Sequence, residues 1–177
     1  MHRSSTYRLP PFQQGGLDSL CGLYSLVNAE RIINHSSDEQ AQKLFDDMVH
    51  FLSRKRILTR ILLDGVIHRH MLLILDQVVN GRIPHIETRW LGQPTPDLDA
   101  FWESMRAFLD GTPGRAIILG LNGYHDHWTV VKRISRSSIE LYDSDQIRRL
   151  ARAECSTSRR RRKHVLLPAQ TYFLSRD

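Results

Sequence analysis

Apolar residues recur at helical spacing through the first 110 residues of the chain. Positions three or four apart form one apolar face in each of four segments, and this periodicity is typical of amphipathic helices. Asp18 or Ser19 is the expected N-cap of the first helix and Asp97 of the last, and Ser37-Asp38-Glu39 is typical of the start of the second. The helices predicted in this way cover residues 19–34, 37–52, 65–79 and 98–109.

After residue 114 the pattern changes to short runs of β-branched, aliphatic and aromatic residues. Such runs, separated by polar turns, predict β-strands. The polar residues 135–137 are the expected turn between the second and third of these strands, and a further short strand is expected at 85–91. The runs after residue 114 cover residues 116–119, 128–131, 139–142, 165–167 and 171–174.

Helices followed by strands predict an α+β domain. We expect one domain over residues 1–177 of papain-like architecture, with an N-terminal helical half packed on a C-terminal antiparallel sheet. The helical half is expected at about 17–110 and the β half at about 114–175, with a basic insertion at 148–163.

Composition narrows the class of protein further. With 177 residues and 41% hydrophobic residues, the chain is long and apolar enough to bury a core, which excludes wholesale disorder. No apolar run approaches the roughly 20 residues of a membrane span, and we expect no secretory signal. Extracellular domains of small size are commonly held by several disulfides, and two cysteines cannot form such a framework. We therefore expect the protein in the reducing cytoplasm.

Most of the positive charge lies in one segment. Residues 148–163 hold eight basic side chains against Glu154 alone, or +7, whereas the whole chain carries +6. The run Arg159-Arg160-Arg161-Arg162-Lys163 can contact nucleic acid, an acidic protein or anionic lipid, or it can be a solvated loop. No aromatic residue is interleaved in this run, so base stacking is not expected.

Cys21 is the candidate nucleophile, because it follows a glycine loop and falls in the first turn of the first predicted helix. Free backbone N–H groups and the helix dipole stabilise an anion there, and the thiolate is the reactive form of cysteine. Gly22 is expected to remove bulk beside the sulfur. The alternative is a small buried core residue, the usual role of a lone cysteine.

His127 and Asp143 are candidates for its partners. If the hairpin turns around Ser135, residue 127 lies opposite 143 and 129 opposite 141, so the carboxylate and the imidazole share a face of the sheet. Gln14, seven residues before Cys21, could donate its amide N–H to an oxyanion, or it could be a solvated loop residue.

These motifs resemble the papain-like cysteine peptidase superfamily, and by length and closing strand its C39-like peptidases most. The resemblance covers about residues 13–145. It rests on Gln14, Cys21-Gly22, His127-Trp128 and Tyr142-Asp143. It implies that Cys21 is the nucleophile, His127 the base and acid, Asp143 the orienting group and Gln14 the oxyanion donor. The gap from Gln14 to Cys21 is one residue longer than is usual in the family.

The resemblance implies a peptidase or isopeptidase that uses a catalytic triad, an acyl-enzyme and no cofactor. The same residues serve a deamidase or an acyltransferase equally well, and a non-catalytic binding module using the basic segment is a further alternative. His125 and His127 could instead bind zinc with Cys21, although a fourth ligand is lacking. The remaining expectations are that His68 and His70 are surface residues and that Cys155 is exposed or structural.

Overall fold

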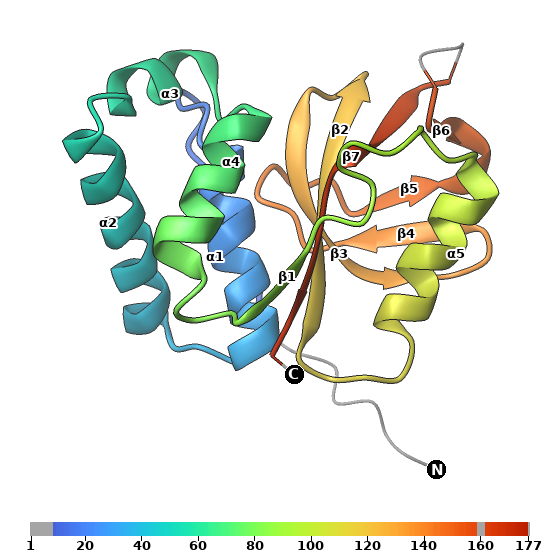
Figure 1. Cartoon of the computed structure of the whole chain (residues 1–177), viewed down its shortest axis with the longest axis horizontal. Coiled ribbons are helices and arrows are strands. Elements are labelled where there is room, and N and C mark those ends of the chain that lie inside the picture. Colours follow the sequence, from blue (N-terminus) through green and yellow to red (C-terminus); the bar gives the residue numbers. More distant parts are fainter. Residues whose placement is uncertain (1–8, 159–161, 177) are drawn as a thin grey trace.

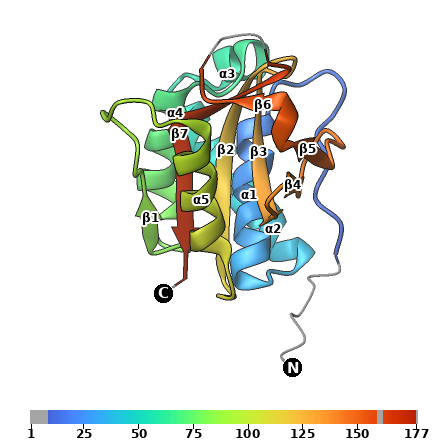
Figure 2. The same ribbon diagram turned by 90° about the vertical axis from the view of Figure 1, so that its right-hand side faces the viewer.

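The structure, a computed structural model, describes residues 9–158 and 162–176, in which helices cover both faces of one sheet (Figures 1 and 2). The helices are α1 (Cys21–Asn34), α2 (Asp38–Arg54), α3 (Leu58–Asp64), α4 (His68–Ile74), the π-helix η1 (Leu75–Val79), α5 (Leu98–Leu109) and the 3-10 helix η2 (Arg152–Glu154). The strands are β1 (His85–Glu87), β2 (Arg115–Gly123), β3 (His127–Ile134), β4 (Ser138–Leu141), β5 (Arg149–Ala151), β6 (Cys155–Ser156) and β7 (His164–Ser175).

Within the described residues the sheet has seven strands, in the order β1-β7-β2-β3-β4-β5, with β6 beside β7. Every pairing is antiparallel except that of β6 with β7. The expected α+β class with an antiparallel sheet is therefore confirmed.

The two faces of the sheet bury separate cores. Ile118, Val130 and Tyr172 pack against α1 and the helices behind it, whereas their chain neighbours Ile117 and Val131 pack against α5. This alternation follows from the pleat, which turns successive side chains to opposite faces. The expectation that α5 belongs to the helical half is wrong, because α5 covers the other face of the sheet (Figure 1).

The predicted helices are confirmed in outline, with three corrections. The N-cap of α1 is Leu20, and Asp18 instead accepts hydrogen bonds from the N–H groups of Gly15 and Leu20. The helix expected at 65–79 begins only at His68, because Gly65 adopts a φ of +82°. Helix α3 was not predicted. The Asp97 cap of α5 is present as expected, and the second helix begins where it was predicted, with Ser37 as its N-cap.

The strands expected after residue 114 are present, but the predicted hairpin register is wrong. Val131 lies opposite Leu141 and Ile134 opposite Ile139, because the turn is centred on residues 136 and 137 and a bulge follows Val131. Within the expected basic insertion, residues 149–151 and 155–156 belong to the sheet as β5 and β6, and the 3-10 helix η2 joins them. Residues 159–161 lie outside the described residues.

Among residues 9–158 and 162–176, no helix combines the length and the hydrophobicity that crossing a membrane requires.

We predict that Gly22→Ala destabilises the fold. Alanine normally stabilises a helix interior by about 1 kcal/mol relative to glycine. At Gly22, however, a Cβ atom would lie only 2.6 Å from the Val66 Cβ, and overpacking costs about 1–3 kcal/mol. Urea unfolding should therefore show a lower free energy of unfolding. Gly81→Ala is the matched control, since a Cβ atom there meets nothing within 4 Å. A Gly22→Ala protein as stable as wild type contradicts this account of the contact.

Candidate active site

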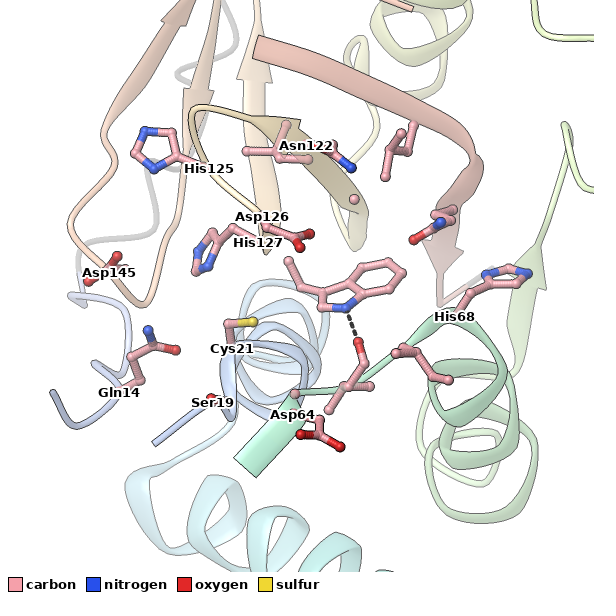
Figure 3. A pocket seen from close by; sticks show the side chains of 18 of the residues that line it. Gln14, Ser19, Cys21, Asp64, His68, Asn122, His125, Asp126, His127 and Asp145 are labelled. Carbon is pink, nitrogen blue, oxygen red and sulfur yellow. Dashed lines mark hydrogen bonds between the residues drawn. The ribbon is translucent and has the colours of Figure 1, made fainter. Parts of the chain in front are cut away.

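Helix α1 carries Cys21 at its first residue, on the face that meets β3. Four residues further along the same face, the buried Ser25 hydroxyl donates a hydrogen bond to the backbone oxygen of Trp128 at 2.8 Å. Because Cys21 precedes Ser25 by about one turn and His127 precedes Trp128 directly, this bond brings the sulfur to the imidazole. Cys21 is half-buried and its side chain borders an open cleft (Figure 3).

His127 and Asp143 form a buried pair at the start of β3. The His127 Nε2 lies 2.7 Å from Asp143 Oδ1, and both residues are less than a tenth exposed. Asp143 lies in the loop after β4, and its Oδ2 accepts hydrogen bonds from the N–H groups of Asp145 and Ile147. The carboxylate is thus held on both sides, and Nδ1 is the imidazole nitrogen left for Cys21.

The charges of this pair are set by its surroundings. Burial by itself lowers the pKa of His127, but hydrogen bonds and charge attraction to Asp143 and Cys21 outweigh it and raise the pKa to about 10. Burial likewise raises the pKa of Asp143, but the bond to His127 lowers it overall. At neutral pH the site therefore holds a carboxylate and an imidazolium beside the sulfur.

An N-terminal arm ties Gln14 to the Asp143 loop. The Gln14 N–H donates to the Ser144 oxygen at 3.0 Å, and the Gln13 side chain donates to the Asp143 backbone oxygen at 3.0 Å. Gln14 therefore borders the same cleft as Cys21 and His127, as the sequence predicted (Figure 3). Its Oε1 is buried and has no hydrogen-bond partner among the described residues.

The opposite wall of the cleft comes from the segment before α4. Trp128 Nε1 donates to the Val66 backbone oxygen, so the segment that follows Gly65 is fixed against the residue after His127 (Figure 3). The cleft has a volume of about 820 Å³. Sequence reasoning missed this wall and the role of Gln13. Gly65, as a helix-ending glycine, was the available signal for the wall.

The other candidate residues have structural surroundings. The expectation of surface histidines is wrong for His70, which is buried, and His68 bonds the Tyr172 hydroxyl through Nδ1 at 2.7 Å. Cys155 is 3% exposed, and burial raises its pKa to about 11. Within residues 9–158 and 162–176, no group of three His, Cys, Asp or Glu side chains is placed to hold a metal.

Two residues of the basic run are described. Arg162 donates to the Ala153 oxygen at 2.7 Å, and Lys163 lies 3.7 Å from Glu154 and over the ring of Tyr124. Arg159, Arg160 and Arg161 lie outside the described residues. The expected partners of this run therefore stay a prediction.

The chain was compared with protein-family models, curated proteins and solved structures. No protein-family model, no curated protein and no solved structure matches the chain.

We predict that His127 titrates far above the usual value of 6.5, near pH 10, in an NMR titration. Cys21→Ala and Asp143→Asn should each lower the pKa, because each removes one partner of the imidazolium. His164 is the internal reference, since burial lowers its pKa. The folded protein holds the His127 proton more tightly, so this contribution to stability is complete below pH 6.5 and is lost as the pH rises towards 10. A His127 midpoint at or below 6.5 contradicts the pairing.

We predict that iodoacetamide modifies Cys21 faster than Cys155 at pH 7. Cys21 borders the cleft beside an imidazolium, whereas Cys155 is buried and its raised pKa keeps it a thiol. Peptide mass spectrometry over time measures both rates. Cys21→Ser should remove the fast reaction and Cys155→Ser should leave it unchanged. Faster modification of Cys155 is the opposing result.

Proposed function

We propose that this chain is a cysteine peptidase or isopeptidase of the papain-like type that hydrolyses amide bonds in polypeptides. One observation carries the proposal: a cysteine at a helix N-terminus lies beside an imidazole that a buried carboxylate holds at 2.7 Å, in a cleft open to solvent. A structural cysteine has no need of such a partner. Nucleophile, base and orienting carboxylate are the parts that acyl transfer requires.

In the first step, the Cys21 thiolate attacks the carbonyl carbon of the scissile amide. The new C–S bond places the carbonyl electrons on an oxyanion, beside the N-terminus of α1. The backbone N–H of Cys21 and the amide of Gln14 are the proposed donors to this oxyanion. Rotation of the Gln14 amide exchanges its oxygen and nitrogen, so the side chain can present an N–H donor towards the cleft. His127 then gives its proton to the leaving amine as the C–N bond breaks.

The second step hydrolyses the thioester. His127, now neutral, takes a proton from water, and the oxygen attacks the acyl carbon. The C–S bond breaks, the acid product leaves, and the sulfur returns as a thiolate beside the imidazolium. Asp143 keeps its charge throughout and holds the imidazole in one orientation.

The placement of the residues supports the papain-like type. The cysteine opens the first helix, the histidine opens a central strand and the aspartate follows the next strand. The cleft lies between the helix and the sheet, as the C39-like resemblance implies. Deamidation or acyl transfer by the same residues would be distinguished by their products.

We predict that the protein cleaves members of a mixed peptide library and that Cys21→Ala abolishes this cleavage. His127→Ala should lower the rate by about 10²- to 10⁴-fold, because it removes the general acid and base. Mass spectrometry of the products separates new chain ends from side-chain deamidation. Cys155→Ala is the matched control and should retain activity. A change that survives Cys21→Ala, or no change at all in any peptide, contradicts the proposal, and deamidation without cleavage contradicts its hydrolytic form.

A further inference from the structure

The lining of the cleft is acidic although the chain as a whole is basic. Four aspartates and a single arginine, Arg69, border the cleft, and these five side chains together carry a formal charge of −3. The formal net charge of the chain is +6. The aspartates are Asp18, Asp64, Asp126 and Asp145.

Two of these carboxylates have partners within the protein. Asp18 accepts two backbone hydrogen bonds in the loop before α1, and Asp64 lies 3.5 Å from Arg60. Asp18 therefore stabilises the loop before α1, and Asp64 stabilises the end of α3. They add negative potential to the cleft without being free to bind a ligand.

Asp126 and Asp145 are different. Asp126 directly precedes His127, and Asp145 follows Asp143 by two residues, so chain connectivity places both beside the reacting groups. Both are exposed, and no ion pair or side-chain hydrogen bond joins either carboxylate to another described residue. In Figure 3 they lie on opposite sides of His127. Both carboxylates therefore border the cleft through which a substrate would reach Cys21.

This arrangement favours a cationic substrate. In the mechanism proposed above, the charges of the Cys21 thiolate and the His127 imidazolium cancel, so the aspartates and Arg69 determine the charge that the substrate meets. Salt limits their reach to about 8–10 Å, which covers the residues next to the scissile bond. Lys163, whose ammonium lies over the ring of Tyr124 at the edge of the cleft, is paired with Glu154 at 3.7 Å. Charges that line one cleft focus their field within it.

We propose that the cleft selects polypeptide segments with lysine or arginine side chains flanking the scissile amide, and that Asp126 and Asp145 contact those side chains. The proposal rests on the hydrolytic function proposed above and adds its substrate class. The cationic head of lysine or arginine would take the place of the missing partner of each carboxylate. Acidic segments would meet like charge in the cleft beside Cys21.

The test uses peptide acyloxymethyl ketones, which alkylate a reactive cysteine. Members of the set are identical except for one position, scanned along the peptide, that holds arginine, its neutral isostere citrulline, or glutamate. The rate of Cys21 modification is followed by intact mass. For at least one position, arginine should react about two- to fivefold faster than citrulline, the range expected for one exposed ion pair, and glutamate should be slowest. The arginine preference should shrink in 1 M salt.

Two variants test whether Asp126 and Asp145 cause the preference for arginine. Asp126→Asn or Asp145→Asn should lower the ratio of the arginine to the citrulline rate, a readout unaffected by any general loss of reactivity. Asp110→Asn, which makes the same change at the end of α5, should leave the ratio unchanged. Equal rates for arginine and citrulline, or a ratio unaffected by both cleft variants, overturn the proposed selectivity while leaving hydrolysis intact. Failure of every probe to modify Cys21 contradicts the hydrolytic function itself.

Discussion

The contact between α1 and β3 determines the geometry of the whole cleft. The buried hydrogen bond from the Ser25 hydroxyl to the Trp128 oxygen fixes the helix along and around its axis relative to the strand. Cys21 lies one turn before the donor, and His127 lies one residue before the acceptor. A buried acceptor left without its donor costs about 1–3 kcal/mol, so other placements of the helix are disfavoured. The hydrogen bond between Ser25 and Trp128 therefore places the Cys21 sulfur next to the His127 imidazole, although neither of these two groups takes part in it.

A buried imidazolium requires a second constraint, because burial alone favours the neutral ring. Asp143 supplies the counter-charge, and two backbone N–H groups keep its carboxylate in place. The N-terminal arm binds the same loop through Gln13 and Gln14. Gln14 and Asp143, separated by 129 positions in the chain, are thereby held at one end of the cleft. Oxyanion donor and orienting group would then depend on a common set of backbone contacts.

Much of this arrangement could be predicted from local patterns. Apolar periodicity and caps gave most of the helices, and β-branched runs gave the main strands. The predicted pairing of residues 127 and 143 used a wrong register, yet the two side chains meet. The partner of Val131 is Leu141 rather than residue 139, a shift of two residues that leaves the side chains of β4 on the predicted face of the sheet. The loop after β4 then brings the Asp143 carboxylate to His127. The side of the sheet that α5 covers, and the burial of His70 and Cys155, depend on tertiary packing that spacing does not encode.

The central proposal is that Cys21 is the nucleophile and that the His127 imidazolium beside it stabilises its thiolate. Ultraviolet difference absorbance between wild type and Cys21→Ser at pH 7 measures this most directly, since the thiolate absorbs where the thiol does not. The account predicts a thiolate signal at neutral pH that disappears in His127→Ala and persists in Cys155→Ser. An absorbance difference of zero at pH 7, or one that is unchanged without the imidazole, would contradict it.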